Sequence, residues 1–150
     1  MKVLQLGVGA IGTVVARHLA GHRAVESLTL GDMDTTRAEA LAREVPGRVA
    51  VERVDAADPQ SLAKVIRGHG LVISAVLPVH NETIMKAVLA SGSHLLDLSS
   101  GGGDELAHDA AWKKAGLVAS GGMASSGVSS SSTVGPTSAA SSASRSKSKP

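Results

Sequence analysis

Three glycines near the amino terminus are spaced in a pattern that suits the binding of a diphosphate. They are Gly7, Gly9 and Gly12, and they separate a short apolar run, residues 3–6, from a stretch with the apolar spacing of a helix. In a strand–turn–helix unit of this kind, the first glycine permits a tight turn and the second lets the main chain approach the anion. The third lets the helix pack closely on the strand, and the first N–H groups of the helix then face the anion.

An acidic residue, Asp32, lies 20 positions after Gly12, at the end of the next apolar run. A carboxylate at that place accepts hydrogen bonds from the hydroxyls of an adenosine ribose, so the motif predicts a dinucleotide site. Two other interpretations are a glycine-rich turn in an unrelated α/β domain and a surface-turn role for Asp32. A secretory signal is disfavoured, because the glycines interrupt its apolar core and Arg17-His18 occupies the place of the small cleavage residues.

Composition narrows the class of protein. The length of 150 residues suits about one domain, and the absence of Phe and Tyr requires an aliphatic core of the kind found in parallel sheets. The chain has no cysteine, which excludes disulfides and is compatible with the cytoplasmic location that we expect. No apolar stretch is long enough for a membrane span, and no His or acidic cluster has the spacing of a metal site.

The net charge of +2 arises in the carboxyl-terminal tail. Residues 125–150 contain Arg145, Lys147, Lys149 and no acid, so residues 1–124 are slightly acidic. With no basic stripe and almost no aromatic side chains, the chain is not expected to bind nucleic acid. Serine makes up 12 of the 26 tail residues, and we expect this Ser-rich segment to be disordered because it has too few large aliphatic residues to form a core.

Strand-like and helix-like patterns alternate along residues 1–124. Helix starts are expected at Thr35 or Thr36, at Asp58 followed by Pro59, and at Asp104. Six alternations predict an α/β fold, a doubly wound parallel sheet of the Rossmann-like type with about six strands. The strands are expected at residues 3–6, 25–30, 48–54, 71–76, 93–98 and 117–119.

Four stretches give the sequence a resemblance to the nucleotide-binding domain of the saccharopine dehydrogenase family, over about residues 1–130. The first is the glycine motif, which many folds share, and the last two together are more distinctive. The stretches are Val3-Leu4-x-Leu6-Gly7-x-Gly9-x-x-Gly12, Val54-Asp55-Ala56-x-Asp58-Pro59, Val72-Ile73-Ser74-Ala75-Val76-Leu77-Pro78-x-x-Asn81 and Ala87-x-Leu89-x-x-Gly92-x-His94-x-x-Asp97.

The resemblance implies an oxidoreductase that acts on a C–N bond of an amino-acid-like substrate, with hydride passing to or from a nicotinamide cofactor. It places the diphosphate on the glycines and on the backbone of Ala10 and Ile11, and the ribose on Asp32. Asp55 and Ala56 would line the adenine pocket. The nicotinamide half would lie along Ala75, Val76, Leu77 and Pro78. The resemblance assigns no catalytic residue in this chain.

The chain departs from the family pattern after the sixth strand. Ser126 stands in the place of a family proline and Ser130 in the place of an asparagine, and serine-rich sequence follows where the substrate domain is expected. We therefore expect a dinucleotide-binding domain at residues 1–124 that lacks the family's substrate domain. Whether this chain catalyses by itself, and whether it forms a homo-oligomer, is left open.

The cofactor is expected to be NAD, because the Asp32 carboxylate repels a 2′-phosphate, with NADP as the alternative if Arg37 meets that phosphate. Asn81 is expected to cap the helix that follows it or to contact the cofactor, and Asp97 to orient substrate or to bind loop amides. His80 and His94 are interpreted as loop histidines rather than acid–base groups. Two other functional hypotheses are an NAD-sensing regulatory module of the potassium-transport type and a poorly folding, non-functional fragment.

Overall fold

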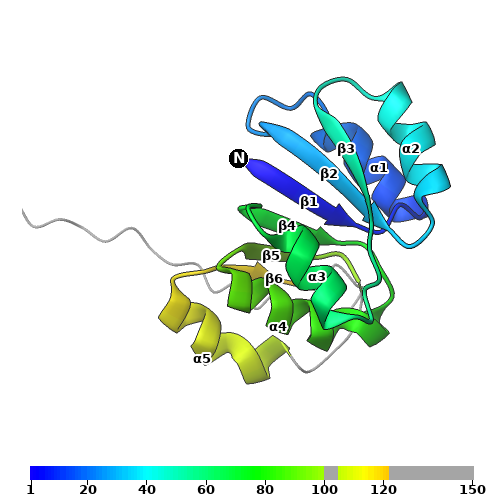
Figure 1. Cartoon of the computed structure of the whole chain (residues 1–150). Helices are drawn as coiled ribbons and strands as arrows, with labels where there is room; N and C mark the ends of the chain where they lie inside the picture. The colour runs from blue at the N-terminus through cyan, green and yellow to red at the C-terminus, as the bar shows by residue number, and fades with distance from the viewer. Residues whose placement is uncertain (100–104, 122–150) are drawn as a thin grey trace, which may run out of the picture.

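A single parallel sheet forms the centre of the computed structural model, which describes residues 1–99 and 105–121 (Figure 1). The strand order is β3-β2-β1-β4-β5-β6, and each neighbouring pair is parallel. The predicted doubly wound α/β fold with six strands is confirmed. The strands are β1 (Lys2–Leu6), β2 (Ser27–Asp32), β3 (Val49–Arg53), β4 (Leu71–Ser74), β5 (His94–Asp97) and β6 (Ala119–Ser120).

Helices cover both faces of the sheet. The helices are α1 (Ala10–Leu19), α2 (Thr35–Glu44), α3 (Pro59–Ile66), α4 (Asn81–Ser91) and α5 (Glu105–Ala115), with a short 3₁₀ helix η1 (Pro78–His80). One core joins α1 and α2 to the sheet through Ala16, Ala38 and Leu41. The other core joins α3, α4 and α5 to the opposite face of the sheet.

None of the described helices is long and apolar enough to cross a bilayer.

The strand expected at 117–119 lies instead at Ala119–Ser120. Two other predicted strands are displaced or shortened because each depends on its neighbour. The strand expected at residues 71–76 ends at Ser74, whose partner in β1 is Leu6. The chain of β1 turns away at Gly7, so residues beyond Ala75 have no edge to pair with. The strand expected at 25–30 instead begins at Ser27, which is the residue opposite the start of β1 at Lys2.

Aspartates begin two of the helices. Asp58 accepts a hydrogen bond from Gln60 N at 2.9 Å and precedes Pro59, as predicted. The cap of α2 was expected at Thr35 or Thr36, and this was wrong: Asp34 is the N-cap and accepts from Thr36 N at 3.0 Å. That backbone hydrogen bond lowers the pKa of the Asp34 carboxyl. The predicted cap at Asp104 and the predicted disordered tail lie outside the described residues.

The direction of the chain creates an opening in the fold. After β1 the chain builds β2 and β3 on one side, and after α3 it returns to build β4, β5 and β6 on the other side. The connections that follow β1 and β4 therefore lead away from each other at the carboxyl ends of the strands. In an open α/β sheet, this reversal point is where ligands bind.

Candidate functional site

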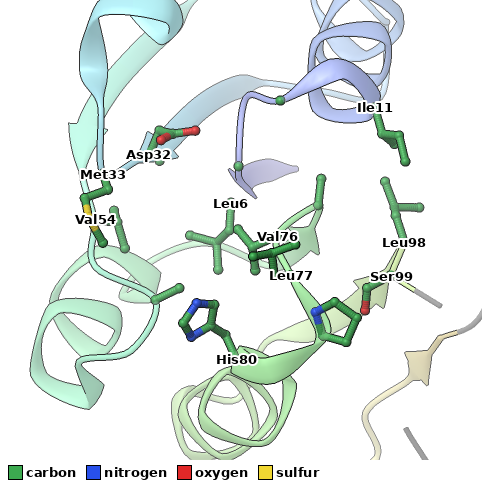
Figure 2. Close-up of a pocket in the computed structure, with 16 residues that line it drawn as sticks. Leu6, Ile11, Asp32, Met33, Val54, Val76, Leu77, His80, Leu98 and Ser99 are labelled. Carbon is green, nitrogen blue, oxygen red and sulfur yellow. The ribbon is translucent and has the colours of Figure 1, made fainter. Parts of the chain in front are cut away.

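A cavity of about 530 Å³ lies at the reversal point, within the size range of small-molecule sites (Figure 2). Its wall combines the glycine loop, the ends of β1 and β2, and the segments that follow β3, β4 and β5. The lining residues are Leu6, Gly7, Gly9, Ile11, Gly31, Asp32, Met33, Val54, Ala56, Ala75, Val76, Leu77, Pro78, His80, Leu98 and Ser99.

The glycine loop presents main chain to this cavity. Gly7 has a φ of +89°, and a Cβ there would lie 2.7 Å from the carbonyl oxygen of Ala75, so both conformation and space require glycine. At Gly9 a Cβ would meet nothing within 4 Å, so the backbone borders open space. At Gly12 a Cβ would collide with the Gly7 carbonyl, and the helix can approach the loop only because that atom is absent.

Helix α1 begins directly behind the loop. Its N-cap is Gly9, which provides no side-chain hydrogen bond to the first turn. The first N–H groups of a helix have no partner within the helix, so those of Ala10 and Ile11 remain available to an anion, and the helix dipole favours negative charge there. The loop therefore has the features of a diphosphate site.

Asp32 is fixed beside the loop by two backbone hydrogen bonds. Its Oδ2 accepts from Val8 N at 2.7 Å, and its Oδ1 accepts from Asp34 N at 3.1 Å. A carboxylate offers about four acceptor positions, so each oxygen keeps a free lone pair. Because Asp32 also lines the cavity, these lone pairs are placed to accept from ligand hydroxyls close to the diphosphate site.

Gln5 supports the loop from below, and the sequence analysis missed it. It is fully buried in β1, and its Nε2 donates to the carbonyl oxygens of Gly7 at 3.0 Å and Gly12 at 2.8 Å. These bonds anchor the Gly7 and Gly12 carbonyls to β1 and so stabilise the conformation of the loop. The signal was present in the sequence, since Gln5 is a polar residue in the middle of an otherwise apolar strand.

The part of the cavity wall formed by the segments after β4 and β5 is more apolar than the part formed by the glycine loop and Asp32. Val76, Leu77 and Pro78 follow β4, and Leu98 follows β5 (Figure 2). Leu77 is 70% exposed and lines the cavity, so its side chain offers an accessible apolar surface to a ligand. His80, from η1, completes this part of the wall.

The structure brings most of the predicted site residues to this cavity. Gly7, Gly9, Ile11, Asp32, Ala56 and the four residues 75–78 line it, whereas Ala10, Gly12 and Asp55 do not. The Asp55 carboxylate accepts from Ala57 N at 2.9 Å and stabilises the turn before α3. Most of the lining residues that we did not predict lie at or just after the ends of β1, β2, β3 and β5, where the reversal rule would have found them. The other one, His80, lies in η1 after β4.

Two predicted polar roles are changed by the structure. Asn81 does not cap α4: it is the first residue of that helix, and its Nδ2 donates to Asp97 Oδ2 at 2.6 Å. Asp97 binds a loop amide, accepting from Ser99 N at 2.9 Å, which was one of its two expected roles. His94 is the first residue of β5 and not a loop histidine as expected; it accepts from Val118 N at 3.1 Å and joins β5 to the segment before β6.

Metal binding finds no support in the described residues, where no three His, Cys, Asp or Glu side chains are grouped to hold an ion. A second hollow of about 720 Å³ lies between α3 and α4, on the helical surface rather than at the strand ends. Its wall includes Ala63, Ala87 and Ala90, with Glu82 and Lys86 joined in an ion pair. The cavity at the carboxyl edge of the sheet, where the strand order reverses, is our candidate ligand site.

Residues 3–119 match the family model described as the saccharopine dehydrogenase NADP binding domain. The chain belongs to this family. The domain is thus an NAD(P)-binding domain of saccharopine-dehydrogenase-like oxidoreductases, and the resemblance inferred from the four sequence stretches is confirmed.

Known proteins similar to this saccharopine dehydrogenase domain are considerably longer. A quinate/shikimate dehydrogenase (NAD(+)) of Corynebacterium glutamicum is 33% identical over 96 residues, covering 62% of this chain and 34% of that protein. A saccharopine dehydrogenase [NADP(+), L-glutamate-forming] of Schizosaccharomyces pombe is 28% identical over 98 residues, covering 65% of this chain and 21% of that protein. The structure of apo saccharopine dehydrogenase from Saccharomyces cerevisiae superposes with a TM-score of 0.72 at 21% identity, covering 81% of this chain and 27% of that one.

Proposed function

We propose that this domain holds a nicotinamide dinucleotide across the cavity for a hydride transfer at a C–N bond of an amino-acid-like substrate. The diphosphate would lie on the glycine loop and the adenosine ribose on Asp32. The nicotinamide would lie against residues 75–78. The observation that carries this proposal is the position of Gly9, where bare backbone borders open space next to the anchored Asp32 carboxylate.

The bound cofactor would supply or accept the hydride, and the residues of this chain would position it. The N–H groups that begin α1 would neutralise diphosphate charge, and Asp32 would fix the adenosine end. The apolar side chains Val76, Leu77 and Leu98 would exclude water from the ring, which limits loss of the hydride to side reactions. Of the hypotheses raised from the sequence, the family match supports this one over a potassium-transport sensor.

The amino-acid-like nature of the substrate is also proposed. The chain spans 34% of the length of the quinate/shikimate dehydrogenase and 21% of the saccharopine dehydrogenase to which it is similar. An amino-acid-like substrate is supported by the family match over residues 3–119. Its binding groups would come largely from protein outside the matched region.

We propose NAD rather than NADP as the cofactor. The Asp32 carboxylate would repel a 2′-phosphate at the ribose position. Two arginines would oppose this repulsion, because their positive charge attracts a phosphate. One is Arg37 in α2. The other is Arg53, which lies opposite Asp32 in the sheet and donates from Nε to Met33 O at 3.4 Å. The similar proteins are named for different cofactors: the quinate/shikimate dehydrogenase for NAD(+) and the saccharopine dehydrogenase for NADP(+).

The substitution Asp32→Asn tests both the ribose role and the preference. It removes the charge with little change in size, so we expect the Kd of NADH to rise about tenfold and the ratio of NADPH to NADH affinity to increase. Isothermal titration calorimetry with both cofactors measures this. Asp34→Asn is the matched control, because it removes the same charge two residues away, outside the cavity wall. Equal effects of the two substitutions would contradict the proposal.

A further inference from the structure

A buried polar cluster lies below the end of the cavity that is farther from Asp32. Asp97 at the end of β5 is 6% exposed, and Asn81 at the start of α4 is 8% exposed. Ser99 follows β5 and reaches the cavity, where Figure 2 shows it at the opposite end from Asp32. The proposed function above assigns no role to these three side chains.

Hydrogen bonds fix the direction in which each member of the cluster donates. Asn81 Nδ2 lies 2.6 Å from Asp97 Oδ2 and 2.9 Å from Ser99 Oγ. Ser99 Oγ lies 2.8 and 2.9 Å from the two Asp97 oxygens. A carboxylate can only accept, so the Ser99 hydroxyl proton must point to Asp97 and the Asn81 amide must turn its NH₂ group toward both partners.

These hydrogen bonds leave the Ser99 hydroxyl able to act toward a ligand only as a hydrogen-bond acceptor. A serine hydroxyl has one proton and two lone pairs. The proton is used by Asp97 and one lone pair by Asn81, so among the described residues one lone pair remains, on a side chain that lines the cavity. The charge of Asp97 polarises the hydroxyl and strengthens it as an acceptor.

We propose that Ser99 is a specificity residue that accepts a hydrogen bond from an N–H group of the bound ligand. The inference rests on the proposed function and names the chemistry recognised at the reacting end: either the carboxamide NH₂ of the nicotinamide or the amine of the substrate. The buried Asn81 Oδ1 has no partner among the described residues.

Calorimetric titration of the full chain tests the carboxamide as the source. The ligands are ADP-ribose, which lacks the nicotinamide, NAD, and nicotinic acid adenine dinucleotide, which replaces the NH₂ by a negatively charged oxygen. Wild-type protein should bind NAD at least about tenfold more tightly than the acid analogue. Ser99→Ala should weaken NAD about fivefold to tenfold and leave ADP-ribose unchanged, and Ser99→Thr should restore NAD binding.

Titration of lysine into the NAD-saturated protein tests the amine as the source, with hexanoate as the analogue that has the same carbon chain and carboxylate but no amine. In that case Ser99→Ala removes lysine binding and leaves NAD unchanged. Ser99→Ala protein that binds NAD, ADP-ribose and lysine as wild type does would overturn the inference alone. Absence of wild-type binding to ADP-ribose would overturn the proposed function and this inference with it.

Folding of each variant is checked by the emission of Trp112, which is buried and is the single tryptophan of the chain. Ser99→Ala should fold, because the Ser99 N–H still donates to Asp97. If it does not fold, the wild-type comparisons still decide. Equal affinities for NAD and its acid analogue overturn the inference unless lysine binds and hexanoate does not.

Discussion

Gly7 and Gly9 are two residues apart, yet a methyl group added to each would meet different surroundings. At Gly9 the added Cβ enters open space, and backbone φ is −73°. We predict that Gly9→Ala folds with unchanged stability but binds NADH at least about tenfold more weakly, because the methyl group occupies space that the diphosphate needs. Urea denaturation followed by Trp112 emission, and calorimetry with NADH, measure the two quantities.

Gly7→Ala provides the contrast. Its Cβ would lie 2.7 Å from the Ala75 carbonyl oxygen at a φ of +89°, so we expect a loss of stability of about 1–3 kcal/mol. Loss of stability in Gly9→Ala, or full NADH affinity in that variant, would show that the loop does not face the ligand in the way described.

Gln5 is predicted to position the loop rather than to contact the ligand. Gln5→Leu removes the hydrogen bonds to the Gly7 and Gly12 carbonyls, and it also removes Oε1, a buried atom with no partner among the described residues. Because these effects oppose each other, we expect stability to change by less than about 1 kcal/mol. NADH affinity should fall about fivefold, while adenosine affinity stays the same. An unchanged NADH affinity would assign Gln5 to packing alone.

The site residues that the sequence predicts are those whose role depends on spacing along the chain. The glycines and Asp32 are separated by one βα unit, so their relative positions follow from local structure. Ser99 was not assigned because its role depends on contacts across the fold, whereas Gln5 was missed although its contacts with Gly7 and Gly12 lie within one strand–turn–helix unit. Ser99 acquires its role only when α4 brings Asn81 against Asp97, and no local pattern encodes that contact.

At the scale of elements, helix starts illustrate what local sequence can decide. Asp58 was predicted as a cap because Pro59 marks the first helical residue, and the structure confirms it. Near Asp34 several residues can cap, and the choice of Asp34 over Thr35 depends on the path of the chain after Asp32. Strand ends are less predictable still, since β4 stops where β1 stops, a property of the neighbour rather than of its own apolar residues.

The Asp58 cap gives a prediction at this scale. Asp58→Ala removes the acceptor for Gln60 N, and we expect the free energy of unfolding to decrease by about 1 kcal/mol. Asp58→Asn keeps a side-chain oxygen and should lose much less. Urea denaturation with Trp112 emission as the probe measures both. Dinucleotide affinity should be unaffected in either variant, because Asp58 does not line the cavity, and equal stability of the two variants would contradict the capping role.

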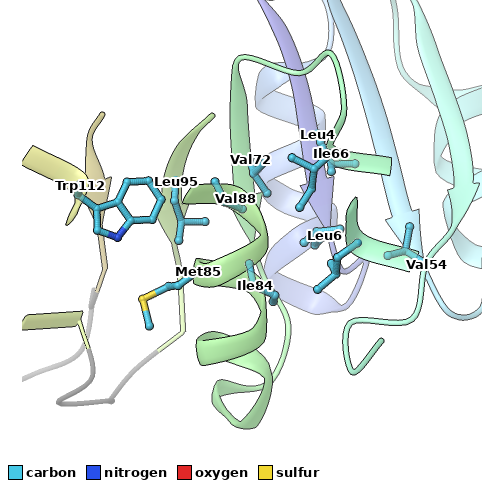
Figure 3. Close-up of a cluster of buried hydrophobic side chains, with 11 residues drawn as sticks. Leu4, Leu6, Val54, Ile66, Val72, Ile84, Met85, Val88, Leu95 and Trp112 are labelled. Carbon is cyan, nitrogen blue, oxygen red and sulfur yellow. The ribbon is translucent and has the colours of Figure 1, made fainter. Parts of the chain in front are cut away.

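At the scale of the whole molecule, two aliphatic cores hold the strand ends in place around the cavity. Figure 3 shows one of them, with Leu6 and Val54 at one end of the cluster and Trp112, a residue of α5, at the other. Leu6 and Val54 belong to both this core and the cavity wall. The packing of this core therefore supports the cavity wall.

The central claim is that the bare glycine loop and Asp32 bind a dinucleotide. Isothermal titration of NAD, NADH, NADP and NADPH into the purified full chain tests it most directly. We predict saturable one-to-one binding, with a Kd of about 1–100 μM and tighter binding of NAD and NADH than of the phosphorylated pair. Absence of detectable binding by all four ligands at millimolar concentration, in protein whose Trp112 emission shows that it is folded, would contradict the account.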